Sequence, residues 1–171
     1  MYKEVYMENP LAVANYFIQR SFDTGKELTP MKLVKLVYIA HGWHLALTEQ
    51  PLINEAVQAW KYGPVINSLY HKFRHYGNRQ ITKTEAEFNG LQMVTPVIDD
   101  SKKEFLNKVW EVYGDRNGIQ LSSLTHQPNT TWYKVWHETG RKDGQLVIIP
   151  NDLLKVHYKE KANAGNQTAT S

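Results

Sequence analysis

The chain has 171 residues, 42% of them hydrophobic, which is enough for one ordinary domain with a sizeable core. It contains no cysteine, which excludes disulfides, thiolate metal sites and a cysteine nucleophile. The net charge of +3 is too small to predict nucleic-acid binding by itself. Because neither a signal peptide nor a membrane-spanning stretch is evident, we expect a cytoplasmic protein with no membrane partner.

Two cap signals open the first two predicted helices. Asn9-Pro10 and Thr29-Pro30 each place an N-cap residue before a proline at the first helical position. The first helix is predicted over about 10–22. The second, Met31 to Leu47, is apolar at 12 of its 17 positions, which cover most of the helix surface. Such a helix belongs in the middle of a core.

The middle of the chain predicts a short extended segment followed by a third helix. Residues 56–60 alternate loosely and are interpreted as a strand or an extended segment. Tyr62-Gly63-Pro64 predicts a turn. The spacing of apolar residues over 65–76 then predicts a helix that ends at Gly77.

The rest of the chain predicts further short elements. Leu91–Val94 is a candidate strand, with a second one near Ile81. The predicted helices cover about 99–113, 119–125, 130–139 and 151–159, with an apolar run at 146–149. We therefore predict a mainly α fold: a single compact helical domain, residues 1–160, with about six or seven helices and a small β element. Residues 161–171 lack large apolar side chains from Ala162 onward and are predicted to be a disordered tail.

Two histidine pairs have the spacing of metal ligands. His41 and His44 are three residues apart, and His71 and His75 are four apart, so each pair lies on one helix face. Neither pair has the glutamate of the metalloprotease motif beside it. We favour structural roles for these histidines and expect neither a metal nor another cofactor.

A hydrolase is a second alternative, built on Ser122-Ser123, His126 and Asp115. No Gly-x-Ser-x-Gly elbow surrounds these serines, although such a turn is what exposes a serine nucleophile in that class of enzyme. On a short helix, the serine hydroxyls are expected to bond locally and His126 to buttress the fold. We therefore predict a binding protein rather than an enzyme.

The most basic stretch, residues 71–79, raises nucleic-acid binding as an alternative function. Lys72, Arg74 and Arg79 alternate there with aromatic residues, a mixture that suits phosphates and bases. The aromatic residues Phe73 and Tyr76, however, fall on the apolar side of the predicted helix. A solvated helix face explains the pattern equally well.

A longer pattern is more specific than any of these motifs. It begins with Leu28-Thr29-Pro30-Met31-Lys32-Leu33-Val34-Lys35-Leu36-Val37-Tyr38 and continues with Trp60-Lys61-Tyr62-Gly63-Pro64-Val65 and Leu69-Tyr70. Leu121-Ser122-x-Leu124-Thr125-His126 and Trp132 complete it, with Thr131 where the similar proteins have proline. In this order the chain resembles the Panacea domain family, also described as SocA-like or phage-associated GepA-like proteins.

The resemblance implies a helix-dominated domain with a small sheet, and an antitoxin role in bacterial and phage toxin–antitoxin pairs. The partner would be a cognate toxin protein; in one branch a Clp-type protease would be a second partner, with the antitoxin acting as its adaptor. We expect the turn at Gly63-Pro64 to hold Trp60 and Tyr62 as a docking surface. A core position for Trp60 is the alternative. The candidate partner-binding residues are Trp60, Tyr62, Gly63, Pro64, Tyr70, His126 and Trp132.

Overall fold

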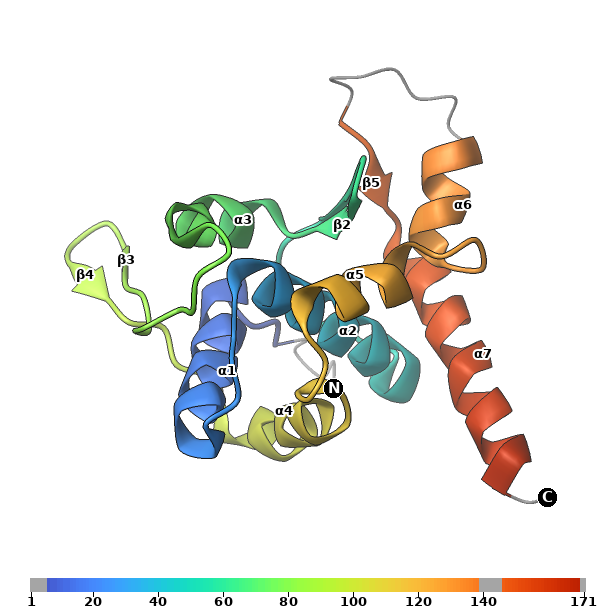
Figure 1. The fold of residues 1–171 in the computed structure, drawn as a ribbon, viewed down its shortest axis with the longest axis horizontal. Helices are drawn as coiled ribbons and strands as arrows, with labels where there is room; N and C mark the ends of the chain where they lie inside the picture. Colours follow the sequence, from blue (N-terminus) through green and yellow to red (C-terminus); the bar gives the residue numbers. More distant parts are fainter. Residues whose placement is uncertain (1–5, 139–145, 170–171) are drawn as a thin grey trace, which may run out of the picture.

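The computed structural model describes residues 6–138 and 146–169 and is organised around one central helix, α2 (Pro30–Thr48) (Figure 1). Nearly every side chain of α2 from Lys32 to Leu45 is buried. The helix contacts α1, α3, α4, α5, α7 and β2, because an apolar surface on all sides requires cover on all sides. The predicted central position of this helix is confirmed.

Seven α-helices account for most of the described residues, which confirms the predicted mainly α fold. They are α1 (Pro10–Thr24), α2, α3 (Asn67–Phe73), α4 (Asp100–Tyr113), α5 (Gly118–His126), α6 (Thr131–Glu138) and α7 (Asn151–Ala169). A single 3-10 turn, η1 (Arg74–Tyr76), extends α3. Both predicted caps are present: Asn9 accepts from the Leu11 N–H, and Thr29 from the Lys32 N–H.

A three-stranded antiparallel sheet lies beside α5 and α6 (Figure 1). Its order is β2 (Gly63–Val65), β1 (Val57–Trp60), β5 (Ile148–Ile149). The pairing of Trp60 with Gly63 puts the tight turn on Lys61 and Tyr62. The turn therefore includes Tyr62 as predicted but lies at residues 61–62 rather than 62–64. The predicted helix start at Val65 is wrong, because Gly63, Pro64 and Val65 return along β1 as a strand.

A second, two-stranded hairpin projects from the body near α1 (Figure 1). It consists of β3 (Glu87–Phe88) and β4 (Met93–Val94). The predicted strand at Leu91–Val94 is confirmed in its last two residues. Its partner is Glu87–Phe88 rather than a strand near Ile81, which is buried and donates its N–H to the Leu28 carbonyl.

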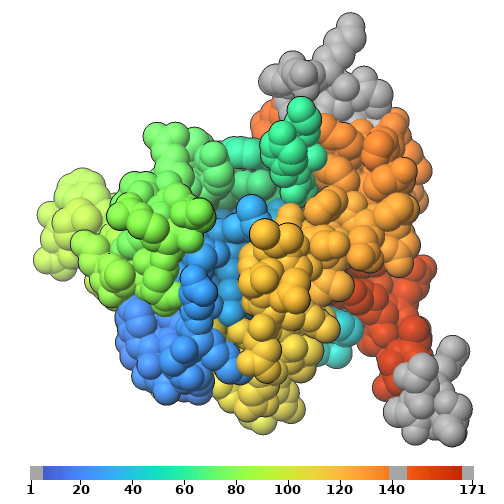
Figure 2. All heavy atoms as spheres, in the orientation of Figure 1, coloured from blue at the N-terminus to red at the C-terminus, as the bar shows by residue number. Residues whose placement is uncertain are grey.

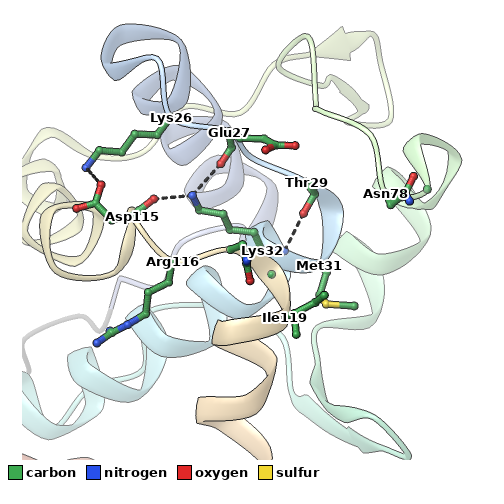
Figure 3. Close-up of a pocket in the computed structure, with 13 residues that line it drawn as sticks. Lys26, Glu27, Thr29, Met31, Lys32, Asn78, Asp115, Arg116 and Ile119 are labelled. Carbon is green, nitrogen blue, oxygen red and sulfur yellow. Dashed lines mark hydrogen bonds and ion pairs between the residues drawn. The ribbon is translucent and has the colours of Figure 1, made fainter.

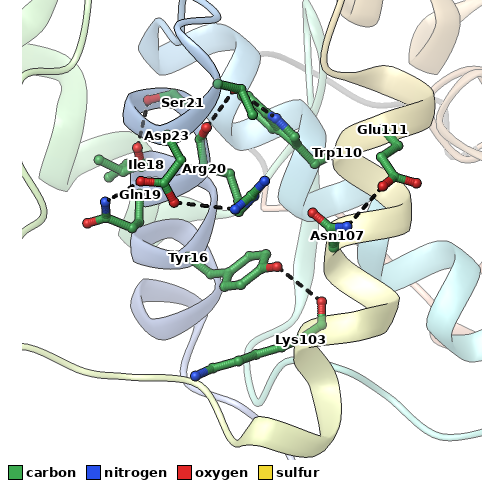
Figure 4. A network of polar contacts seen from close by, with 11 residues as sticks. Tyr16, Ile18, Gln19, Arg20, Ser21, Asp23, Lys103, Asn107, Trp110 and Glu111 are labelled. Carbon is green, nitrogen blue, oxygen red and sulfur yellow. Dashed lines mark hydrogen bonds and ion pairs between the residues drawn. The ribbon is translucent and has the colours of Figure 1, made fainter.

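Contacts between α1 and α4 close one side of the core (Figure 4). The buried indole of Trp110 stacks on Phe17, with ring centroids 6.2 Å apart, and its N–H donates to the Thr24 hydroxyl over 3.2 Å. The Tyr16 hydroxyl donates to the Lys103 carbonyl over 3.1 Å. Hydrogen bonds on either side of the Trp110–Phe17 contact thus fix the orientation of α1 relative to α4.

The last helix, α7, extends beyond its predicted end. It runs to Ala169, ten residues past Lys159, so the segment for which composition predicts disorder is helical through Ala169. A helix that has already formed gains a hydrogen bond with each added residue without a new nucleation cost, and Ala162 and Ala164 are favourable helix formers. A boundary between residues 1–160 and 161–171 stays a prediction.

Both histidines of the central helix have structural roles. The buried His41 donates from Nε2 to Asn151 Oδ1 over 2.9 Å and accepts the Leu52 N–H at Nδ1 over 3.3 Å. Burial lowers the pKa of its imidazole to about 4. His44 donates from Nδ1 to the Gln50 carbonyl, and its Nε2 faces the Lys102 amine. Over residues 6–138 and 146–169 there is no group of three or more potential metal ligands, and no helix is long and apolar enough to cross a membrane.

Candidate functional site

The β1–β2 hairpin presents an aromatic outer face. Alternate residues of a strand point to opposite faces, and Val57, Ala59 and Ile149 are buried against the helices. Trp60 and Gln58 therefore point outward, and Ile148, which pairs with Gln58 and is 41% exposed, lies on the same side of the sheet. Tyr70 of α3 packs edge-on against Trp60, with ring centroids 4.8 Å apart. We call Trp60, Tyr62, Tyr70 and Ile148 the hairpin face.

The two aromatic residues at the ends of this face differ in their surroundings. Trp60 is half-buried, and its Nε1 donates to Gln58 Oε1 over 2.8 Å. Tyr62 lies in the turn with 78% of its surface exposed, and the Lys61 amine lies 5.5 Å from its ring centroid. The side chain of Trp60 is thus partly covered by its neighbours, whereas most of the Tyr62 side chain is exposed to solvent.

Trp132 supports the hairpin from below. It is only 5% exposed, and its Nε1 donates to the Trp60 carbonyl over 2.7 Å. Its ring stacks on Trp136 and receives the edge of His126 at 5.7 Å. The structure therefore brings Trp132 and His126 to the hairpin, with Trp132 as a buried support whose side chain is not available at the surface.

A hydrolytic triad is not assembled around His126. Its Nδ1 bonds back to the Ser122 carbonyl within α5, while the Ser122 hydroxyl lies 3.5 Å away. Asp115 is engaged by Lys26 at 2.9 Å, outside this contact. The nitrogen nearest the hydroxyl is therefore occupied by a carbonyl, and the carboxylate that would orient a catalytic histidine is bound elsewhere.

A buried lysine lies directly under the hairpin. Lys35 is 5% exposed, and its amine donates to the Pro64 carbonyl over 2.7 Å. Desolvation lowers the pKa of this amine to about 7. The lysine therefore ties the return strand β2 to the second turn of α2.

Gly63 allows this close approach. Its φ of +124° lies in the region that favours glycine, and a Cβ built there would lie 2.8 Å from Lys35 Nζ. Both the backbone conformation and the space above the lysine therefore call for glycine. Pro64 follows at a position where its carbonyl, rather than an N–H, is used.

Lys32, one turn earlier on α2, forms a similar tie (Figure 3). Its buried amine donates to the carbonyls of Glu27 and Gly114 over 2.7 and 2.5 Å and lies 5.2 Å from the Trp110 ring centroid. Desolvation lowers the pKa of this amine as well. It lines a cavity of about 540 Å³ between the first turns of α2 and α5. The cavity therefore lies beside the hydrogen bonds of Lys32 and away from the β1–β2 hairpin.

Sequence reasoning missed the roles of both lysines and of Ile148. In the sequence, Lys32 and Lys35 count only as polar interruptions of an apolar helix. The available signal was the apolar surface itself: on a helix covered on all sides, a lysine has no solvent-facing side and must bring its amine to an acceptor. Ile148 could not be placed, because its neighbour Gln58 lies ninety residues away in the chain.

Comparison with known proteins identifies the family of the chain. Residues 33–133 match the model of the family described as antitoxin SocA-like, Panacea domain. The chain belongs to this family. It is also 27% identical over 152 residues to the antitoxin SocA of Caulobacter vibrioides (strain NA1000 / CB15N), an alignment that covers 86% of this chain and 81% of that protein. No solved structure matches the chain.

The matched region of this Panacea domain contains most of the candidate site. It includes Lys35, the β1–β2 hairpin, Tyr70, His126 and Trp132, and it leaves out α1, α7 and β5. The antitoxin assignment of the family fits the predicted binding role.

The position of Thr131 in the fold explains why it can stand where the similar proteins have proline. It is the first residue of α6, the helical position that accepts proline best, so the fold tolerates either residue there.

Proposed function

We propose that this protein is a cytoplasmic, non-enzymatic antitoxin that neutralises its cognate toxin by direct binding through the hairpin face. The observation that carries the proposal is the combination of an exposed aromatic surface with buried anchors. Trp60, Tyr62 and Tyr70 supply the residue types that dominate binding energy at protein interfaces. Lys35 and Trp132 hold the strands that carry them.

Anchoring matters because binding must compensate for the loss of conformational freedom. A hairpin whose backbone is bonded to α2 and α6 loses less freedom when it meets a partner than an unattached loop does. The antitoxin family supports a toxin as that partner. A small hairpin face that is fixed in advance is well suited to blocking a specific surface of another protein.

Co-expression with the protein encoded by the neighbouring gene tests the proposal. We expect the neighbour alone to arrest growth, and the wild-type antitoxin to restore growth and co-purify with it. Tyr62→Ala and Ile148→Asp should abolish rescue while the folded antitoxin stays at wild-type level. Phe88→Ala, which removes a 66% exposed aromatic ring from the β3–β4 hairpin, is the matched control and should rescue fully.

Two other outcomes are informative. Rescue accompanied by loss of the neighbour protein, and restored neighbour levels in a host without Clp-type protease, would assign the adaptor mechanism to this chain. Full rescue by both hairpin-face variants would contradict the proposed binding surface. A neighbour that is harmless and forms no complex would contradict the antitoxin function itself.

A further inference from the structure

The charge of the chain is unevenly distributed around the hairpin. Residues 56–84 contain five lysines and arginines and no aspartate or glutamate. Since the whole chain carries a net charge of +3, the remaining residues together carry −2. The excess positive charge is therefore concentrated in the segment that holds β1, β2, α3 and η1.

Two of these cations lie beside the hairpin face. Lys61 lies in the turn beside Tyr62, and Arg74 follows Tyr70 by one helical turn. Rings connect the two areas, because Tyr70 contacts Trp60 on one side and His71 on the other. In Figure 2 the hairpin and the α3–η1 segment adjoin on one face of the molecule. We call the five cations of residues 56–84 the cationic border, after the two that adjoin the hairpin face: Lys61, Lys72, Arg74, Arg79 and Lys83.

The cationic border has no ion pairs among the residues that the structure describes. Elsewhere on the surface, Lys26, Lys103 and Lys159 each contact a carboxylate. In the border, Lys72 donates only to the Ala86 carbonyl, and Arg79 to the carbonyls of Tyr76 and His75. These acceptors are uncharged and do not neutralise the cations, so a partner of opposite charge is attracted to this side of the molecule.

We propose that the toxin presents an acidic surface to the cationic border, which steers it onto the hairpin face. This inference rests on the proposed function and adds the chemistry of the partner. Complementary charge around an aromatic centre raises the association rate and selects the partner, while the rings provide most of the affinity. The hairpin face is the centre of the interface and the border is its rim.

An acidic protein fits this surface better than nucleic acid does. Phe73 and Tyr76, the rings interleaved with the cations, are 0% and 8% exposed and present no face on which a base could stack. Trp60 and Tyr70 contact each other edge-on, which also covers part of their ring faces.

Association rates of charge-reversal variants test the inference. The probe is the purified product of the neighbouring gene, measured at about 50 mM and about 500 mM salt, across which screening shortens the range of exposed charges severalfold. We expect Arg74→Glu to lower the association rate at low salt about tenfold and Arg74→Lys to keep it near wild type. The loss should shrink at high salt. Lys108→Glu, an equal charge change on exposed α4, should stay within about twofold.

Each other outcome overturns the inference in a distinguishable way. If the wild type binds the probe and Arg74→Glu binds equally fast, the antitoxin function stands and the acidic partner is rejected. If the wild type does not bind the probe, both proposals fail together. If Arg74→Glu instead abolishes binding of a labelled DNA duplex or single-stranded RNA and leaves the probe unaffected, the border is a nucleic-acid surface. Circular dichroism confirms that each variant is folded.

Discussion

The two hairpins of this Panacea domain have similar lengths but differ in how they are held. The β1–β2 hairpin has a third strand beside it and is bonded from below by Lys35 and Trp132. The β3–β4 hairpin has two strands and projects from the body, with Phe88, Leu91 and Met93 between 62% and 90% exposed. Its polar ties lie at its base, where Asn15 bonds the backbone of Glu85.

The difference shows what an exposed apolar side chain can be used for. Both hairpins carry such side chains, but in the first the strands themselves are bonded to buried side chains, whereas in the second the buried Asn15 bonds residues that flank the strands. An exposed ring on an anchored backbone keeps its position when a partner arrives, and so contributes to affinity at a lower entropic cost. This contrast predicts that equivalent substitutions in the two hairpins have unequal effects.

The largest difference is expected between two variants: one removes the aromatic support of the first hairpin, and the other removes an exposed ring of the second. Trp132→Ala deletes a buried indole and its bond to the Trp60 carbonyl, which should lower the free energy of unfolding by about 3–5 kcal/mol. Phe88→Ala should change it by less than about 0.5 kcal/mol. Urea unfolding followed by circular dichroism measures both, and equal losses would mean that the hairpins are held alike.

The buried amine predicts an unusual pH dependence. The pKa of Lys35 is about 7 in the folded chain against 10.5 for an exposed lysine. Between pH 7 and 10.5 the amine is protonated in the unfolded chain and neutral in the folded chain, so the free energy of unfolding rises with pH. Below pH 7 the folded chain bears the full cost of burying a charged amine. From pH 7 to 9.5 the contribution is about 3 kcal/mol.

Lys35→Met removes the titrating amine. The free energy of unfolding of this variant should therefore lack the increase that the wild type shows between pH 7 and 9.5. Lys83→Met, at an exposed position, should keep the wild-type slope. Chemical unfolding at a series of pH values gives the comparison. A wild-type slope in Lys35→Met would show that the amine under the hairpin is not the titrating group.

Two glycines with positive φ allow a matched test of the space above that amine. Gly63 has φ +124° with Lys35 Nζ 2.8 Å from the site of a Cβ, whereas Gly90 has φ +99° with nothing within 4 Å. Both alanine variants pay the conformational cost, and only Gly63→Ala must also displace a buried, bonded lysine. We expect Gly63→Ala to lower the free energy of unfolding by about 2 kcal/mol more than Gly90→Ala does, because it disturbs a buried hydrogen bond. Urea unfolding of both variants gives the difference as midpoint multiplied by m-value.

The smallest effect concerns α6, which carries Trp132. The Thr131 hydroxyl is buried without a hydrogen-bond partner within the described residues, whereas the Thr125 hydroxyl donates to the carbonyls of Leu121 and Ser122. Thr131→Val should therefore raise the free energy of unfolding by about 1 kcal/mol, and Thr125→Val should lower it. Thermal unfolding shows the two shifts, and a lower melting temperature for Thr131→Val would mean that its hydroxyl is satisfied.

Sequence reasoning found the helices because their signals are local. The caps at Asn9 and Thr29 and the continuous apolar surface of α2 determine those elements from within a few turns, and the structure confirms them. The same holds for the structural interpretation of His41, which an apolar helix predicts. Hydrophobic pattern and capping chemistry therefore account for most of the fold.

The candidate site was only partly predictable because it is assembled from distant segments. Its aromatic residues were identified, but the strand at Gly63–Val65 depends on its pairing with β1, and Tyr62-Gly63-Pro64 alone resembles an ordinary turn. The role of Lys35 depends on where the Pro64 carbonyl lies, 29 residues later. The extension of α7 to Ala169 was missed because composition does not show a helix that is already nucleated.

The acceptors of the two buried lysines have a consequence for how this domain diversifies. Lys32 and Lys35 are held by main-chain carbonyls of residues 27, 114 and 64, not by carboxylate side chains. A carbonyl is present whatever residue occupies the position, so mutation of a surface side chain does not remove the acceptor. The loops can therefore exchange their recognition residues while the framework stays in place, much as an antibody varies its binding loops on a constant scaffold.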